Sequence, residues 1–443
     1  MWDKEESLNR EELQAIQLER LQATVKRAYE RVPYYRELLD EQGVTPADIR
    51  SLEDVRLLPF TTKDVLREQY PYGLFAVPLE EIVRLHASSG TTGKPTVVGY
   101  TKQDLKTWAN LIARIVTMAG VERRDIAQIC FGYGLFTGAF GLHYGLEEVG
   151  VTIVPASTGN SEKQIMLMQD FGTTVLVSTP SYALYLAEVA RGMGVEPRSL
   201  GLRIGLFGSE PWSEEIRQQI EAEWGLFATD NYGLSEVMGP GVAGECQARQ
   251  GLHINEDHFL VELINPETGE PVGPGEQGEL VFTPLTKEAL PILRYRTRDL
   301  ATLDYAPCAC GRTLVRMSRV CGRSDDMLVI RGVNVFPTQV ESVLLTVPAV
   351  APHYQLVVRK KGFLDDLEVR VEIKEEYFTD DYKKLVEIEE EIRHKLQNVL
   401  SIGTKVSLAA PGSIERFTGK ARRVLDLRQE GKGRKNEGTA DRQ

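Results

Sequence analysis

Two short apolar runs, each followed by small polar residues, constrain the fold of this chain most strongly. They are "TTVLVSTPS" at residues 173–181 and "LRIGLFGSEPW" at residues 202–212. Such runs are typical of strands buried on both faces, whose carboxyl ends open into binding loops. We therefore expect an α/β protein with binding loops at the edge of a buried sheet.

The length of the chain and a change in its pattern near residue 324 predict more than one domain. A chain of 443 residues exceeds what one hydrophobic core usually organises. Helices are expected at 10–32 and 34–42. Beyond residue 324 we expect a strand at 333–336, a helix from Pro337 to about 346, a hairpin at 354–374, a helix from Thr379 to about 400 and a strand at 405–411. The prediction is a large domain of residues 1–324, a compact domain of residues 325–430, and a disordered polar tail of residues 431–443.

Charge and composition exclude several classes of protein. A net charge of −12 argues against a general nucleic-acid binder, which needs a basic surface. No stretch approaches the roughly 20 apolar residues of a membrane span. Five cysteines in a chain of this length do not suggest a disulfide framework. We expect a cytoplasmic protein with reduced thiols and no nucleic-acid or membrane partner.

The segment "HASSGTTGKPTVVGY" at residues 86–100 has the composition of an anion-binding loop. Backbone amides, four hydroxyls and one ammonium can surround a phosphate. It is not a Walker-type P-loop, because Ser88 stands where the first Gly belongs and Pro95 follows Lys94. A flexible linker is the alternative, but a linker rarely leads directly into a β-branched run. The candidate phosphate-binding residues are Ser88, Ser89, Gly90, Thr91, Thr92, Gly93 and Lys94.

Six motifs in order resemble the adenylate-forming enzymes, the superfamily of acyl- and aryl-CoA ligases, adenylation domains and luciferases. They are "SSGTTGKPT" (88–96), "FGSEPW" (207–212), "DNYGLSE" (230–236), "YRTRDL" (295–300), "GRSDDMLVIRGVNVFPTQVE" (322–341) and "GSIERFTGKARRVLDLR" (412–428). The segments "FGYGLFTGAFGLHYG" (131–145) and "GLHINEDHF" (251–259) narrow the resemblance to the phenylacetate-CoA ligase branch. It implies a large N-terminal domain of several subdomains and a smaller, mobile α+β C-terminal domain.

The resemblance also implies a two-step reaction that uses ATP, Mg²⁺ and coenzyme A. An acid would attack the α-phosphorus of ATP to give an acyl-adenylate and pyrophosphate, and the thiol of coenzyme A would then displace AMP. Glu236 would bind Mg²⁺, and Asp299 would accept hydrogen bonds from the ribose. The remaining nucleotide contacts implied are Ser209, Glu210, Pro211, Asn231, Tyr232, Gly233, Ser235 and Arg323.

The family's single catalytic lysine matches Lys420, in "FTGKARR". An ammonium between the carboxylate and the α-phosphate offsets two anions that must approach each other. Asp325 matches the hinge position, where a few residues absorb the rotation of the second domain between the two half-reactions.

Glycine and aromatic residues alternate in the segment 131–145, which favours a pocket for a planar acid. Tyr133, Phe136, Gly138 and Phe140 are the candidate walls. Helix packing through small residues is the alternative interpretation. The resemblance alone points to phenylacetate; indoleacetate, hydroxyphenylacetate and benzoate-like acids fit the same residues.

Three cysteines and one histidine could form a structural zinc site. Cys308 and Cys310 lie in one turn, and Cys246 precedes His253 by seven residues. Together they offer the Cys₃His ligand set of a closed tetrahedral site. Scattered free thiols are the alternative, and Cys130 and Cys321 are expected to be buried thiols.

Three functions remain open from the sequence. The first is an aryl-acid CoA ligase. The second is an adenylating enzyme that loads the pantetheine of a carrier protein, and the third is a non-catalytic nucleotide-binding protein. The resemblance implies a homodimer, with the aryl acid, ATP and coenzyme A as small-molecule partners.

We expect Lys420→Gln to lower acid-dependent ATP–pyrophosphate exchange by about 100-fold or more, because one preorganised charge is lost from the transition state. The affinity for ATP should change far less, since the other nucleotide contacts remain. Exchange at the unchanged rate would contradict the role of Lys420.

Overall fold

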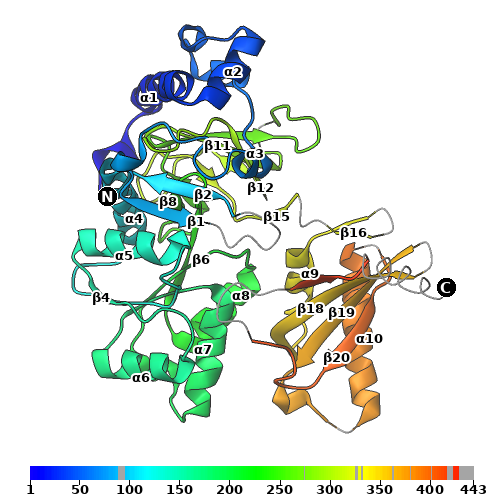
Figure 1. Ribbon diagram of the computed structural model, residues 1–443. Helices are drawn as coiled ribbons and strands as arrows, with labels where there is room; N and C mark the ends of the chain where they lie inside the picture. The colour runs from blue at the N-terminus through cyan, green and yellow to red at the C-terminus, as the bar shows by residue number, and fades with distance from the viewer. Residues whose placement is uncertain are drawn as a thin grey trace, which may run out of the picture. The chain divides into compact units, whose positions relative to one another are not determined.

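The computed structural model describes residues 1–87, 95–273, 275–324, 328–330, 333–361, 364–379, 381–400, 402–416 and 423–428. The chain divides into two compact units (Figure 1). The first contains Met1–Ser209 and Ile220–Ser324, and the second contains Glu210–Gln219 and Asp325–Gln443. The domain limits expected from the sequence stay a prediction, and the expected tail lies outside the described residues.

A nine-stranded sheet forms the centre of the first unit. Its strands follow the order β13-β14-β9-β8-β7-β6-β5-β3-β4. They are β3 (Ile126–Ile129), β4 (Thr152–Val154), β5 (Val175–Ser178), β6 (Ile204–Gly208), β7 (Phe227–Leu234), β8 (Gly239–Glu245), β9 (Leu252–Ile254), β13 (Leu303–Asp304) and β14 (Arg316–Met317). The pairs from β4 to β7 are parallel, and the pairs from β7 to β13 are antiparallel.

The parallel half confirms the two strands expected from the apolar runs. Every residue of β5 and of β6 is buried. Parallel neighbours need crossover connections, and helices supply them here. These are α5 (Thr137–Val149), α6 (Ser161–Phe171), α7 (Pro180–Gly192) and α8 (Glu214–Trp224), whose residues up to Gln219 group with the second unit.

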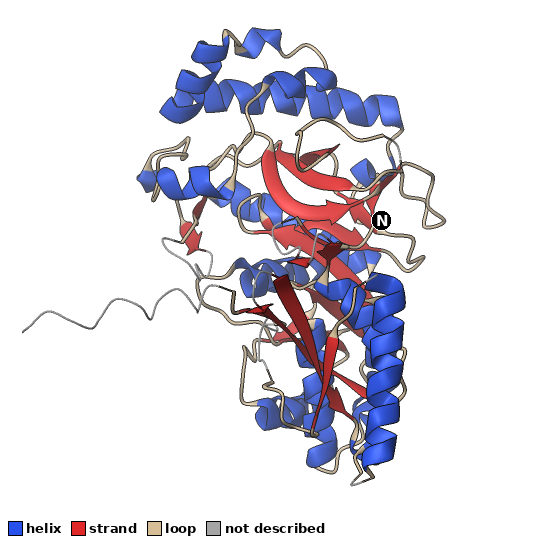
Figure 2. Cartoon of the chain, turned by 90° about the vertical axis from the view of Figure 1, so that its right-hand side faces the viewer, coloured by secondary structure: helices blue, strands red, loops and turns tan. Residues whose placement is uncertain are grey.

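Two smaller sheets and four further helices complete the first unit. One sheet has the order β10-β11-β12-β15, from Phe259–Ile264, Gly278–Pro284, Tyr295–Ala301 and Gly322–Arg323, and the other pairs β1 (Arg84–Ala87) with β2 (Val97–Tyr100). The helices are α1 (Arg10–Arg31), α2 (Pro33–Gln42), α3 (Lys63–Glu68) and α4 (Lys102–Met118). Helices α1 and α2, which confirm the two expected N-terminal helices, lie beside each other in Figure 2.

The second unit is built on a four-stranded sheet of order β20-β19-β18-β21. The strands are Lys405–Ala409, Leu364–Ile373, Val350–Lys361 and Val424–Asp426, with a separate pair β16 (Leu328–Ile330) and β17 (Val333–Val335). Helices α9 (Pro337–Leu344) and α10 (Tyr382–Leu400) pack on its core through Val340 and Leu396.

The second-unit elements expected from the sequence are confirmed with shifted ends. The hairpin of β18 and β19 is present, and β17 and β20 occupy the expected strands. The expected start of the last helix at Thr379 is wrong, because α10 begins at Tyr382. The Thr379 hydroxyl instead accepts a hydrogen bond from the Asp381 amide ahead of the helix, at 3.2 Å.

Among the described residues, no helix combines the length and apolar character needed to cross a bilayer.

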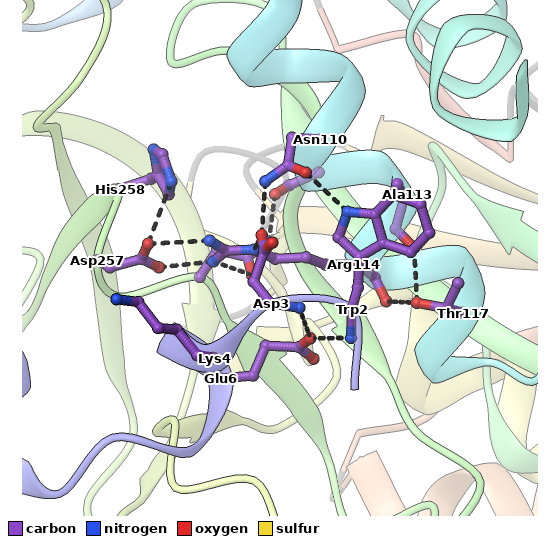
Figure 3. Close-up of polar contacts among 12 residues, drawn as sticks. Trp2, Asp3, Lys4, Glu6, Asn110, Ala113, Arg114, Thr117, Asp257 and His258 are labelled. Atoms are coloured by element: carbon purple, nitrogen blue, oxygen red, sulfur yellow. Dashed lines mark hydrogen bonds and ion pairs between the residues drawn. The ribbon is translucent and has the colours of Figure 1, made fainter. Parts of the chain in front are cut away.

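Ion pairs of Arg114 on α4 join the N-terminal segment to the loop after β9 (Figure 3). The Arg114 guanidinium donates to Asp3 at 2.5 Å and to both carboxylate oxygens of Asp257 at 2.7 and 3.1 Å. Burial would raise the pKa of Asp257, but His258 and Arg114 hold that pKa well below its usual range. Asp257 is therefore a charged group whose burial depends on its cationic neighbours.

We expect Arg114→Met to lower the free energy of unfolding by about 3–5 kcal/mol, because it removes the guanidinium that binds both oxygens of the buried Asp257 carboxylate. Denaturant unfolding measures this change. Arg124→Met is the matched control, since the Arg124 side chain is 78% exposed. Equal stability of the two variants would contradict the importance of the buried pair.

Candidate active site

The carboxyl ends of β6 and β7 bring together the first group of predicted nucleotide contacts. Gly208 pairs with Asn231 across these parallel strands, and Ser209 follows with a φ of 70°. A Cβ at Gly208 would lie 2.3 Å from the Asn231 carbonyl oxygen, so only glycine fits there. The Asn231 amide donates to the Phe207 carbonyl at 3.2 Å. Its buried Oδ1 has no hydrogen-bond partner in the described part of the chain, which suits a donor such as the adenine amino group.

Three further predicted contacts are joined by hydrogen bonds. The Tyr232 hydroxyl donates to one carboxylate oxygen of Asp299 at 2.7 Å. Arg323 donates to the other oxygen at 3.0 Å, because β15 pairs with β12 at this position. Burial is the main cause that raises the pKa of Tyr232, and Asp299 adds to it. Strands β7, β12 and β15 therefore position the Asp299 carboxylate between the Tyr232 hydroxyl and the Arg323 guanidinium.

Glu236 lies just beyond β7 and is 7% exposed. The Thr96 hydroxyl donates to its carboxylate at 3.5 Å. A buried carboxylate beside a hydroxyl fits a hard divalent cation such as Mg²⁺, which prefers oxygen ligands. Ser235 shares a hydrogen bond of 2.8 Å with Thr137, the first residue of α5.

The remaining predicted residues differ in what the structure gives for them. The phosphate-binding residues Ser88–Lys94, the hinge residue Asp325 and the catalytic Lys420 lie outside the described residues. Glu210 and Pro211 group with the second unit. Gly233 is exposed on β7, and a Cβ there would lie 2.1 Å from the Gly239 carbonyl oxygen.

The predicted acid-pocket residues surround the start of α5. The rings of Tyr133 and Phe140 meet edge to face at 5.3 Å, and Phe136 is 37% exposed. A Cβ at Gly138 would lie 2.5 Å from the Phe136 ring, so this glycine allows the ring to lie on the helix. Tyr133 therefore lies against Phe140, and Phe136 lies against Gly138.

Other glycines of the same segment pack helices, as in the alternative interpretation. A Cβ at Gly141 would lie 2.5 Å from the Trp108 ring, and one at Gly145 would lie 2.1 Å from Ile112. Trp108 and Ile112 belong to α4, so these glycines allow α4 and α5 to approach closely. The packing interpretation therefore holds for Gly141 and Gly145, and the pocket for a planar acid stays a prediction.

The sequence did not single out three polar groups close to these residues. Thr96 could have been noticed, because it directly follows the phosphate-binding loop. His86 lies just before that loop, and its ring nitrogen Nδ1 and the Ala87 amide both donate to the Leu135 carbonyl at 3.0 Å. Lys287 is fully buried with its ammonium 4.4 Å from the centre of the Tyr100 ring. Burial lowers the pKa of Lys287 to about 8, although Asp104 and Glu236 oppose this.

The four predicted zinc ligands converge. One ligand atom from each of Cys246, His253, Cys308 and Cys310 lies within 4.8 Å of the others. The Cys246 and Cys308 sulfurs are 3.7 Å apart, and the Cys310 sulfur is 3.4 Å from Nε2 of His253. Nδ1 of His253 faces the Leu314 carbonyl at 3.4 Å, which places its proton there and leaves Nε2 as the free ligand atom. A metal bound by all four would have no open position.

Hydrogen bonds favour the thiolate of Cys310. Burial would raise its pKa, but bonds from the Arg312 amide and guanidinium, among others, lower it. Of the other cysteines, Cys130 is buried and burial raises its pKa to about 12. The expectation that Cys321 is buried is wrong, because this residue lies in the connection before β15 and is exposed.

Models of known protein families match residues of both units. The model of the AMP-binding enzyme family matches residues 16–283, and that of the AMP-binding enzyme C-terminal domain matches residues 332–428. A phenylacetate-coenzyme A ligase of Thermus thermophilus is 53% identical over 438 residues, covering 96% of this chain and 98% of the relative. One of Escherichia coli is 50% identical over 428 residues, covering 96% and 97%.

A solved structure gives the same result for the fold. A 2-hydroxyisobutyryl-CoA ligase in the postadenylation state, in complex with R3-HIB-AMP, matches with a TM-score of 0.91 and 30% identity over 97% of this chain and 92% of that one. The chain therefore belongs to the AMP-binding enzymes, the adenylate-forming superfamily. Within it, the chain falls in the phenylacetate-CoA ligase branch.

We expect Asp299→Asn to raise the KM for ATP about ten- to a hundredfold, because it removes a charged hydrogen-bond acceptor worth about 1.5–3 kcal/mol. Acid-dependent pyrophosphate exchange at varied ATP measures this change, and the KM for the acid should stay within a few-fold. Asp64→Asn is the control, since its side chain is 79% exposed. An unchanged KM for ATP in Asp299→Asn would exclude a nucleotide contact at this carboxylate.

Proposed function

We propose that the protein joins phenylacetate to coenzyme A in an ATP-dependent reaction that releases AMP and pyrophosphate. The observation that carries this proposal is 49–53% identity to four phenylacetate-coenzyme A ligases, with 96% of the chain covered in each case. The aromatic segment before and within α5 supports a planar aryl group as the acid's side chain.

The chemistry explains why ATP is consumed. A carboxylate acylates a thiol poorly, because its leaving group would be oxide. Attack of the carboxylate oxygen on the α-phosphorus forms an acyl–phosphate bond and breaks the bond to pyrophosphate. The thiol sulfur then attacks the acyl carbon, loses its proton, and releases AMP. Neither step requires a covalent bond to the enzyme, so positioning and charge neutralisation account for catalysis.

Each proposed residue role follows from this scheme. The free Oδ1 of Asn231 would accept from the adenine amino group, and Asp299 would accept from the ribose. Ser88–Lys94 would hold the β- and γ-phosphates. Glu236 and Thr96 would hold Mg²⁺, which neutralises phosphate charge when bound. Lys420, on the second domain, would offset the two reacting anions, and rotation about Asp325 would then admit the thiol.

The other two candidate functions are less well supported. Loading of a carrier protein would use the same residues, but the relatives at about 50% identity are named as coenzyme A ligases. The presence of Glu236, Asp299 and Lys420 argues against a protein that binds a nucleotide without catalysis. A homodimer, a cytoplasmic location and the absence of a nucleic-acid partner stay predictions.

We also propose that Cys246, His253, Cys308 and Cys310 bind one structural Zn²⁺ per chain. The convergence of their ligand atoms within 4.8 Å supports this site. Three thiolates and one imidazole suit zinc better than hard cations, which prefer oxygen.

We expect phenylacetate to give the highest kcat/KM in a panel of aromatic acids assayed by AMP release with coenzyme A. Benzoate, which lacks one methylene, should be poorer by about tenfold or more, because a shorter acid leaves part of the pocket unfilled. Hydroxyphenylacetate and indoleacetate complete the panel, and a pantetheinylated carrier protein replaces coenzyme A in a second series. Preference for another acid, or for the carrier, would overturn the proposal.

Purified protein should contain about one zinc per chain by elemental analysis, since the four ligands form one closed site. Cys308→Ser should lose the metal, whereas Cys130→Ser should retain it, because Cys130 lies apart from the cluster. Wild-type protein without zinc, after expression in zinc-supplemented medium, would refute the metal site.

A further inference from the structure

The residues directly after the last thiol of the Cys/His cluster are bonded to the N-terminal segment. The Arg312 guanidinium donates to the Glu6 carboxylate at 2.5 Å. The Thr313 amide donates to the Glu6 carbonyl at 3.1 Å, and the Thr313 hydroxyl donates to the Leu8 carbonyl at 2.5 Å. The turn that carries two of the four proposed zinc ligands is therefore attached to residues 6–8.

Arg312 connects the two regions through charge as well as geometry. Its side chain is 7% exposed and that of Glu6 is 0% exposed. Arg312 follows Cys310 by two residues, and both residues line the same cavity. A zinc ion with three thiolates and a neutral imidazole carries one net negative charge, so a buried guanidinium beside one thiolate stabilises the loaded site.

Glu6 is itself held in place by the N-terminal turn. One of its carboxylate oxygens accepts from the amides of Trp2 and Asp3 at 2.6 and 2.9 Å (Figure 3). Asp3 in turn accepts from Asn110 at 2.6 Å and from Arg114. The position of the Arg312 guanidinium therefore depends on the docking of the whole segment on α4.

A cavity of about 430 Å³ lies beside the cluster. Its walls include the proposed ligands Cys246 and Cys310, together with Arg312 and Met1. The N-terminal residue Met1 thus lines the same cavity as two of the proposed ligands.

We propose that Arg312 is a positioning residue of the metal site, and that docking of the N-terminal segment through the Glu6–Arg312 pair determines how tightly the metal is held. This inference rests on the proposed zinc site. Because coupling between two binding events is reciprocal, bound metal also strengthens the docking of residues 1–8. The segment acts through Arg312 and does not supply a ligand itself.

The test measures the rate at which zinc passes from the full-length protein to a chromogenic chelator. Arg312→Met and Glu6→Gln should each release zinc about 10- to 100-fold faster than wild type, since loss of a partner of a metal ligand typically weakens metal binding by that factor. Arg294→Met is the matched control. Arg294 pairs with Glu262 at 2.8 Å and is similarly buried, at 6% exposed, but it lies just before β12.

A second measurement separates the inference from general destabilisation. Amide hydrogen exchange of residues 1–13 should be faster in chelator-treated wild type than in zinc-loaded wild type, while exchange in α7 stays the same. Arg312→Lys, which keeps the charge, should recover part of the zinc retention. If Arg312→Met does not fold, Glu6→Gln still reports on the pair.

The outcomes distinguish this inference from the zinc proposal. Wild-type protein that binds no zinc would refute the metal site itself. A second outcome is that wild type binds zinc, but Arg312→Met and Glu6→Gln release it at the wild-type rate or at the rate of Arg294→Met. That outcome would overturn the role of Arg312. Unchanged exchange of the N-terminal amides on metal removal would overturn the reciprocal coupling.

Discussion

The parallel pairing of β6 with β7 is the constraint on which the nucleotide side of the first unit depends. Parallel neighbours end at the same edge of a sheet, so the residues after both strands meet there. The approach is so close that Gly208 leaves no space for a side chain beside Asn231. Tyr232 then reaches Asp299 on another sheet, and Glu236 reaches Thr96. One strand pair thus positions the residues that we propose contact the base, the ribose and the metal.

The antiparallel half of the same sheet carries the Cys/His cluster. Gly244 on β8 is the cross-strand partner of both Asn231 on β7 and His253 on β9. A proposed nucleotide contact and a proposed zinc ligand therefore occupy one row across three strands. The ion pairs around Asp257 and Glu6 secure the N-terminal segment against the region beside this row. Buried charge is paired at each of these points, because an unpaired charge there would be strongly destabilising.

Sequence reasoning succeeded where a local pattern has a single physical meaning. Consecutive apolar residues at 173–181 and 202–212 predicted buried strands, and both formed. It did less well where the outcome depends on distant neighbours. Gly141 and Gly145 look like Gly138 in the sequence, yet they pack against α4 while Gly138 accommodates Phe136. Lys287 carries no local signal of burial, and only the surrounding fold encloses its ammonium beside Tyr100.

The sequence by itself determined the superfamily, the order of its motifs and the identity of the candidate ligands, because these reside in residue types at fixed spacings along the chain. Only the tertiary structure decided which side chains meet. Cys246 and Cys308 are separated by 62 positions and still face each other at 3.7 Å. The Glu6–Arg312 pair spans 306 positions. Sheet register and the burial of charge set such contacts, and both depend on segments that no short stretch of sequence contains.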